Sequence, residues 1–301
     1  MIAKGMSGGE IVVAVDGSQH SLKALDWAVD AARSGGRQLV VVHVLSDETQ
    51  MWRARRDAVL GTPEHEPPDP VTEHARSHLY EREDLPEIRY ESKEGELEGV
   101  LQERGARGAM LVVGSRGRGG FASLLLGSTS RLVATKAAVP VVVVRHTAED
   151  AAADAPVLLG LNPTETADEV IAFAFGCAEE QGRPLVALTA FPSPAAPLPM
   201  FGTPMAGVPE DDAAPLTREI ERAQQERLAP YTGSFTAVRV QSEIGAGDSA
   251  GQLVARSETA SLLVVGRHRR RVKADSLMMG SVTNAVLHHA HCPVAVVPGL
   301  E

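Results

Sequence analysis

Cysteine, aromatic residues and long apolar runs are all scarce in this chain of 301 residues. The two cysteines, Cys177 and Cys292, are too few for a disulfide framework, which favours a reducing compartment such as the cytoplasm. No apolar run approaches the roughly 20 residues that a membrane-spanning helix needs. The first ten residues also lack the apolar segment of a secretion signal. These absences predict a cytoplasmic protein that does not enter a membrane.

An excess of basic residues is missing as well. The formal net charge is −10 at pH 7, which argues against nucleic acid and against an anionic membrane surface as partners. Hydrophobic residues make up 44% of the chain, which is enough to bury a core. A chain of this length is expected to form two domains.

A glycine-rich stretch in the first half is the most informative part of the sequence. The apolar run 110–113 predicts a buried strand, and the hydroxyl residues Ser128 and Thr129 are expected to cap a helix that starts there. A glycine-rich loop between a strand and a helix N-terminus directs backbone amides at one point, an arrangement that binds phosphate. We expect glycine in the loop because a Cβ would block the anion and because some positions need positive φ. The alternative is an ordinary turn that happens to contain glycines.

The spacing of these glycines separates the loop from other nucleotide-binding loops. It lacks the Gly-Lys-Ser/Thr of a Walker loop and the G-x-G-x-x-G of dinucleotide-binding folds. The spacing that is present, Gly114-x2-Gly117-x9-Gly127-Ser128, resembles the loop of the universal stress protein family, whose ATP-binding members carry G-x2-G-x9-G followed by Ser or Thr. The resemblance implies ATP as the ligand, and it leaves open whether Mg²⁺ accompanies the nucleotide.

Strands and helices are expected to alternate along the first half. Apolar runs predict strands at 11–16, 39–45, 110–113 and 141–144, with a weaker strand at 88–91. Helices are expected from residue 18 to the Gly35-Gly36 pair and at 71–82, 96–104 and 128–134, whereas the polar segment 46–70 is expected to be a long loop. This alternation predicts an α/β fold with a parallel sheet. The family resemblance implies five strands in the order 3-2-1-4-5.

The pattern restarts after a small polar linker at 146–155. Apolar runs at 157–162, 184–189, 262–266 and 293–297 repeat strands of the first half, and Gly247 and Gly251 repeat Gly95 and Gly99 at one constant shift. We therefore predict a tandem duplication with domains at 1–149 and 150–301. The resemblance to universal stress proteins covers nearly the whole chain. The fold class that it implies is two tandem, open, five-stranded parallel sheets flanked by helices.

The two halves differ at positions on which the resemblance depends. Asn162 replaces Asp16, Pro163 replaces Gly17 and Arg269 replaces Gly117, and the second loop gains one residue. These changes predict that the second half binds ATP weakly or not at all. The basic segment 267–271 leaves two alternatives open, a different anion site or a solvated basic loop.

The resemblance assigns roles to residues at the ends of the first and fourth strands. Asp16 contacts the nucleoside, and the phosphates meet the loop and the start of its helix at Gly114, Gly117, Gly127, Ser128 and Thr129. A carboxylate in this place suits a ribose hydroxyl or a metal ion that bridges to the phosphates, and the structural alternative for Asp16 is a contact with the helix start at residues 18 and 19.

Four further residues are candidates because of where they stand. Ala14 and Val42 are expected to form a wall for adenine, with ordinary core packing as the alternative. Arg116 and Arg118 lie in the loop and can balance phosphate charge, with solvated surface arginines as the alternative.

Two histidine features are expected to be structural. His288 and Cys292 stand four residues apart, as zinc ligands on a helix do. However, Cys292 directly precedes the proline that opens the last strand, so the helix must end before it. We therefore expect no metal site. His43, in the second strand, is expected to be a core histidine with its ring hydrogen-bonded.

Three functions are compatible with these observations. The first is a nucleotide-dependent regulatory or stress-response protein that binds ATP without fast turnover, because no loop lysine, placed base or catalytic set is found. The second is a slow ATPase or phosphotransferase, and the third is a nucleotide-independent scaffold for an unidentified protein partner. The last strands of the two halves are expected to pair with each other, and homodimer formation is left open. The proline-rich segment 192–215 is expected to be a loop, either a cover for the nucleotide or a disordered insertion.

Overall fold

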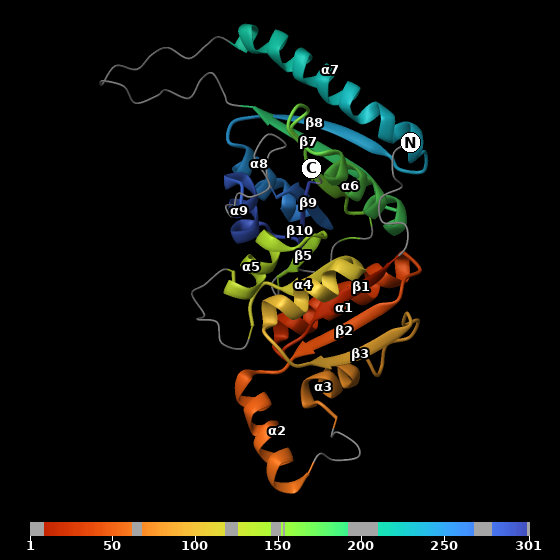
Figure 1. The fold of residues 1–301 in the computed structure, drawn as a ribbon. Coiled ribbons are helices and arrows are strands. Elements are labelled where there is room, and N and C mark those ends of the chain that lie inside the picture. Colours follow the sequence, from red (N-terminus) through yellow and green to blue (C-terminus); the bar gives the residue numbers. More distant parts are fainter. Residues whose placement is uncertain are drawn as a thin grey trace, which may run out of the picture. The chain divides into compact units, whose positions relative to one another are not determined.

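The computed structural model describes residues 9–61, 68–117, 126–145, 152, 154–191, 210–267 and 279–299. The chain divides into two compact units, a first unit within residues 7–147 and a second unit from residue 148 onward. Each unit is an α/β structure built on a parallel sheet (Figure 1).

The first unit contains five strands whose order is β3-β2-β1-β4-β5. This order is the predicted 3-2-1-4-5, and every pairing within it is parallel. Its elements are β1 (Glu10–Ala14), α1 (Gln19–Ser34), β2 (Leu39–Val44), α2 (Asp47–Leu60), α3 (Pro70–His78), β3 (Ile88–Lys93), α4 (Leu97–Arg107), β4 (Gly108–Gly114), α5 (Ser128–Lys136) and β5 (Val141–Val144).

The second unit repeats this order as β8-β7-β6-β9-β10. Its elements are β6 (Val157–Gly160), α6 (Asp168–Gln181), β7 (Leu185–Phe191), α7 (Glu210–Ser234), β8 (Val240–Ala246), α8 (Ser249–Arg256), a 3-10 turn (Ser257–Thr259), β9 (Leu262–Gly266), α9 (Ser281–His289) and β10 (Val294–Val297). The pairing of the last strands of the two halves stays a prediction.

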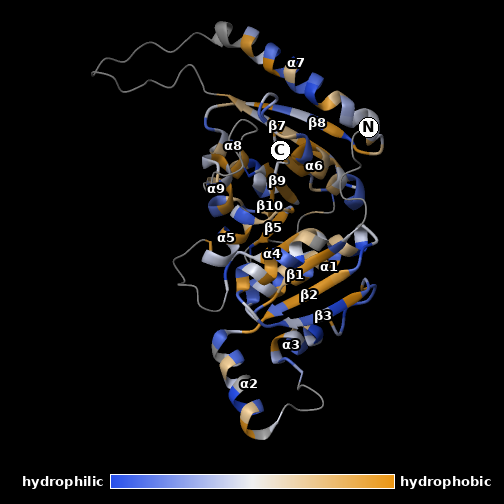
Figure 2. Cartoon of the chain, viewed as in Figure 1, coloured by the Kyte–Doolittle hydropathy of each residue, from blue (hydrophilic) through white to orange (hydrophobic). Residues whose placement is uncertain are grey.

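The central strands form the core of each unit because both of their faces are covered by helices. Most residues of β1, β2, β4 and β5 are buried and apolar, as expected for parallel strands, and Figure 2 shows these strands as the apolar part of the unit. In the first unit, α1 packs beside α3 and α4 packs beside α5. Right-handed crossovers place these two pairs on opposite faces, because the chain moves from β1 towards β3 but from β4 towards β5. The sheet therefore has its topological switch point between β1 and β4, where ligands bind in folds of this type.

The segment 46–70 is not the expected long loop. Residues 47–60 form α2, whose N-cap Ser46 accepts a hydrogen bond from the Thr49 amide at 3.3 Å. The helix contains neither glycine nor proline, which suits helix formation, but it has no apolar stripe for a periodicity argument to detect. Met51, Trp52 and Val59 on this helix are exposed.

Two other boundaries differ from the expectation. The helix α3 ends at His78 rather than at residue 82, with Asp69 as its N-cap. In the second unit, residues 210–215 of the expected loop already belong to α7, which contains Pro215. The rest of that expected loop, 192–209, and most of the linker lie outside the described residues.

Candidate functional site

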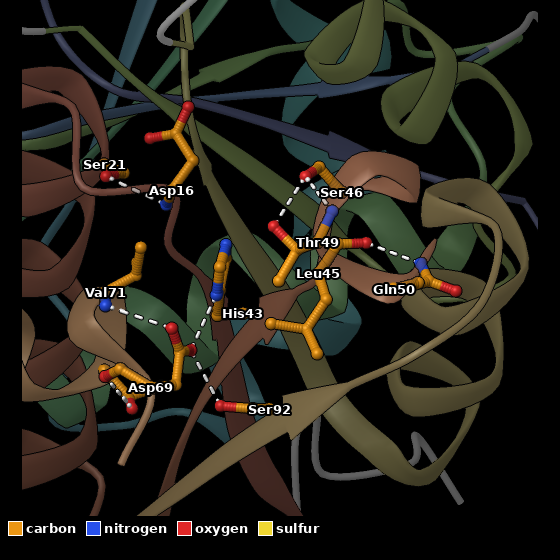
Figure 3. Close-up of polar contacts among 11 residues, drawn as sticks. Asp16, Ser21, His43, Leu45, Ser46, Thr49, Gln50, Asp69, Val71 and Ser92 are labelled. Atoms are coloured by element: carbon orange, nitrogen blue, oxygen red, sulfur yellow. Dashed lines mark hydrogen bonds and ion pairs between the residues drawn. The ribbon is translucent and has the colours of Figure 1, made fainter. Parts of the chain in front are cut away.

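The end of β1 and the start of α1 are joined by a tight turn that places Asp16. Asp16 Oδ1 accepts a hydrogen bond from the Ser18 amide at 3.0 Å, and Ser18 in turn caps α1 by accepting from the Ser21 amide. Figure 3 shows the Asp16 amide directed at Ser21, whose hydroxyl accepts from it at 3.3 Å. The contact that we gave as the structural alternative for Asp16 is therefore present, and it uses one carboxylate oxygen.

The glycine-rich loop leaves β4 beside α1. A Cβ added to Gly114 would lie 2.7 Å from the carbonyl carbon and oxygen of His20, so close packing of β4 on α1 requires glycine there. Gly114, Gly117 and Gly127 do not have positive φ, whereas Gly119 and Gly120 of the same loop lie outside the described residues. Close approach of backbone, and not an unusual backbone conformation, explains these glycines.

The two ends of the loop are fastened together by a pair of hydrogen bonds that we call the loop clasp. The Gly127 amide donates to the Ser115 carbonyl at 2.7 Å, and the Ser130 hydroxyl donates to the Gly114 carbonyl at 2.6 Å. The Gly127 amide therefore holds the loop together in this structure. Its expected role as a phosphate donor would require it to leave or share that bond.

The most direct contact between loop and strand end is made at Gly117. This residue is exposed, and a Cβ placed on it would lie 2.6 Å from Asp16 Oδ2. The loop backbone thus lies against the one carboxylate oxygen that the turn does not use. The spacing G-x2-G brings its second glycine to Asp16, and any side chain at position 117 would have to displace the carboxylate.

The start of α5 differs from the expectation in one respect. Gly127 is the N-cap residue and makes no side-chain cap hydrogen bond, so Ser128 and Thr129 do not cap the helix. Ser128 is exposed and Thr129 is half-buried at the first turn. Both therefore stand at the helix N-terminus, where a backbone dipole favours an anion.

A second arginine joins Arg116 at this edge of the sheet. Arg145 directly follows β5, and its pKa is lowered first by burial and then by the positive charge of Arg116. Two guanidinium groups that repel each other form a region that an anion would stabilise. Sequence reasoning missed Arg145, although its position directly after the fifth strand was visible.

The two residues expected to form an adenine wall differ in exposure. Ala14 is half-buried at the end of β1, whereas Val42 is fully buried opposite it in β2. Val42 therefore packs in the core in this structure, and only Ala14 offers surface. Arg118 lies outside the described residues.

The second unit keeps the loop clasp and changes the groups around it. The Gly280 amide donates to the Arg267 carbonyl at 3.1 Å, and the Thr283 hydroxyl donates to the Gly266 carbonyl at 2.6 Å. Half-buried Arg267 stands where the first unit has Ser115, and burial lowers the pKa of that arginine. Pro298 follows the last strand where the first unit has Arg145.

The turn after β6 also differs from the turn after β1. Gly17 has a φ of 78°, which the ring of Pro163 cannot adopt. Asn162 Oδ1 accepts from the amides of Thr164 and Glu165 and from the Thr164 hydroxyl, so this oxygen is fully used within the turn. Arg269 and the rest of 268–278 lie outside the described residues, as do 118–125 of the first loop.

The histidine features have separate outcomes. His43 Nδ1 lies 2.6 Å from Asp69 Oδ2, which confirms that its ring is hydrogen-bonded, but the residue is half-buried and not fully enclosed in the core. Cys292 is buried, and burial raises the pKa of its thiol to about 12, so it is not a ready metal ligand. Among the residues that the structure describes, no group of three or more His, Cys, Asp or Glu could hold a metal ion. None of the helices described there is long and apolar enough to cross a membrane.

Comparisons with known proteins agree with the repeated architecture. A universal stress protein of Mycobacterium tuberculosis is 30% identical over 307 residues, covering 95% of this chain and 96% of that protein. A universal stress protein of Mycolicibacterium smegmatis is 30% identical over 297 residues with the same coverage. The crystal structure of a universal stress protein from Archaeoglobus fulgidus covers 96% of this chain at 20% identity with a TM-score of 0.63, which supports the fold. The model of the universal stress protein family matches twice, at residues 9–145 and 155–298, and the chain belongs to that family as a tandem member.

Proposed function

We propose that the first unit binds ATP and that the protein acts as a nucleotide-dependent regulatory or stress-response protein. The observation that carries this proposal is the contact of Gly117 with Asp16, because it joins the glycine loop to a carboxylate at the switch point of the sheet. In this proposal the domains extend over residues 1–149 and 150–301, and the second domain has lost the nucleotide chemistry.

The chemistry of the edge suits a nucleoside triphosphate. Arg116 and Arg145 provide positive charge, and the N-terminus of α5 provides amides and a hydroxyl at Ser128. Asp16 Oδ2 is a charged acceptor that suits a ribose hydroxyl and would repel a phosphate. The nucleoside therefore belongs on the Asp16 side and the phosphates on the arginine side.

A pair of glycine variants tests this proposal. We expect Gly117→Ala to weaken ATP binding at least about tenfold, because the new Cβ meets Asp16 Oδ2 at 2.6 Å. Gly99→Ala in α4 is the matched control, since nothing lies within 4 Å of its new Cβ. It should leave ATP affinity unchanged and stabilise the protein by up to about 1 kcal/mol.

Titration calorimetry of the wild type and both variants gives the affinities. Equal ATP affinity in the wild type and Gly117→Ala would contradict the proposed site. Mass spectrometry of the small molecules released when the purified wild-type protein is denatured shows whether it carries nucleotide. Steady phosphate release that Gly117→Ala abolishes would instead favour the ATPase.

A further inference from the structure

Three polar side chains meet at the carboxyl ends of β2 and β3 in the first unit. Asp69 Oδ2 accepts a hydrogen bond from the Ser92 hydroxyl at 2.7 Å and lies 2.6 Å from His43 Nδ1, while its Oδ1 accepts from the Val71 amide at 3.1 Å. The Asp69 side chain is only 4% exposed, and His43 is 15% exposed (Figure 3). A buried carboxylate thus holds a histidine whose side chain is partly exposed.

The hydrogen bonds fix the charge of Asp69 and the tautomer of His43. Burial alone would raise the pKa of Asp69, but the hydrogen bonds from Ser92, His43 and the Val71 amide together lower it, so the group remains a carboxylate. A carboxylate can only accept, and His43 must therefore donate through Nδ1. In the tautomer that carries its hydrogen on Nδ1, Nε2 is the acceptor atom of the ring.

The Nε2 atom of His43 is directed away from Asp69. Figure 3 shows the ring between Asp69 and Asp16, with its second nitrogen on the side opposite the Asp69 contact. The described part of the chain provides no hydrogen-bond partner for Nε2. Val42 is paired with Ala14 across the two strands, so His43 lies beside the segment that leads to Asp16.

The second unit shows that the fold does not require this pair. Thr189, the fifth residue of β7 as His43 is of β2, meets fully buried Gln224 from α7. Gln224 Nε2 donates to the Ala187 carbonyl at 2.8 Å and to the Thr189 hydroxyl at 3.1 Å. A buried neutral amide thus occupies the position where the first unit holds a carboxylate and a partly exposed imidazole.

ATP has few groups that an acceptor nitrogen can recognise. Its phosphates are acceptors, and its donors are the 6-amino group of adenine and the two ribose hydroxyls. Asp16 is the acceptor assigned to the ribose, which leaves the amino group for His43. We propose that His43, positioned by Asp69, selects adenine by accepting a hydrogen bond from its 6-amino group, an inference that rests on the proposed ATP site.

Inosine triphosphate tests this assignment because it carries a carbonyl oxygen in place of the 6-amino group. We expect the wild type to bind ATP at least about tenfold more tightly than inosine triphosphate, since Nε2 and the carbonyl would be two facing acceptors. In His43→Asn, the amide nitrogen takes the place of Nδ1 and keeps the bond to Asp69, but no atom replaces Nε2. This variant should bind ATP about tenfold more weakly and should lose the preference for ATP.

Controls separate the possible failures. Thr189→Ala should keep the wild-type affinities for both nucleotides, and thermal unfolding reports whether each variant is folded. Wild type that binds ATP and inosine triphosphate equally overturns this inference alone, whatever the variants do. An unchanged preference for ATP in folded His43→Asn overturns the inference too. So does a loss of affinity that His43→Asn shows with ATP but not with 2′-deoxy-ATP, because His43 would then contact the ribose 2′-hydroxyl. Wild type that binds neither nucleotide overturns the proposed ATP site itself.

Discussion

Asp16 and Asn162 make the same backbone contact with different charges. Asp16 Oδ1 accepts from the amide two residues ahead at 3.0 Å, and Asn162 Oδ1 accepts from Thr164 at the same distance and spacing. The turn therefore needs an oxygen at this position but not a negative charge. This hydrogen bond therefore does not require the negative charge of Asp16.

Asp16→Asn separates the role of this side chain in the turn from its proposed contact with the nucleoside. We expect the variant to unfold at nearly the wild-type temperature, because the amide oxygen can replace Oδ1 in the turn as it does at Asn162. Its affinity for ATP should fall about tenfold, since a hydrogen bond from a ribose hydroxyl to a carboxylate is stronger than one to a neutral amide. Calorimetry and a thermal melt on the same sample check both halves of the prediction. Unchanged or tighter ATP binding would mean that the carboxylate does not contact the nucleoside.

At the residue scale, the spacing of the glycines was visible in the sequence, but the groups that lie against each glycine were not. The pattern predicted that Gly117 tolerates no side chain, and the structure identifies the obstacle as Asp16. The role of Arg145 depends on the pairing of β4 with β5, which brings two strand ends together across many residues of sequence. No local pattern contains that information. The prediction that Ser128 and Thr129 cap the helix was wrong for a related reason. The hydroxyl that bonds to the loop belongs to Ser130, which donates to the Gly114 carbonyl.

At the element scale, the loop clasp recurs in both units with the same donor and acceptor types. Ser130 and Thr283 are both buried, and each donates at 2.6 Å to the carbonyl of the last residue of the preceding strand. The clasp is therefore a structural part of the strand-loop-helix element, independent of the loop sequence between its ends.

A matched pair of variants tests that independence. Ser130→Ala and Thr283→Val each remove one buried hydrogen bond, and we expect each to lower the free energy of unfolding by about 1 kcal/mol. Only Ser130→Ala should also weaken ATP binding, because only its loop approaches Asp16. Denaturant melts and ATP titrations of the two variants give the comparison. If Thr283→Val weakened ATP binding as much as Ser130→Ala, the assignment of the site to the first unit would be wrong.

Elements with apolar periodicity were predicted well, and the polar helix was not. The stripe of α1 and its glycine end follow from spacing, and Gly35 indeed caps it. By contrast, α2 has an N-cap and helix-forming residues but no apolar stripe, and its Met51, Trp52 and Val59 side chains are exposed. A periodicity argument recognises burial, so it has nothing to detect in such a helix.

At the scale of the whole molecule, the repeat predicts two similar units with unequal chemistry. The strand order is the same in both, yet an arginine at 145 corresponds to Pro298, and Ser115 corresponds to a half-buried arginine at 267. The duplication was readable because apolar runs and glycines of the first half recur in the same order in the second half. The partners of Asn162 were not readable, because the three residues that follow it fold back onto its side chain.

This inequality predicts the stoichiometry of binding. We expect one ATP per chain in a calorimetric titration of the full protein. Gly117→Ala should weaken that one binding event and should not reveal a second. The physical reason is that the second unit lacks the carboxylate, the glycine with positive φ and the cation after the last strand. Two equivalent tight sites per chain would contradict the asymmetry.

The recurrence of the clasp bears on how such a duplicated protein diverges. When both rims of a loop are anchored by main-chain and hydroxyl contacts, substitutions between the rims do not disturb the sheet beneath. In the second unit the segment 267–271 is rich in arginine, and the loop clasp at Arg267 and Gly280 is kept. The second unit thus keeps the hydrogen-bonded ends of the loop, while the sequence between them differs from that of the first unit.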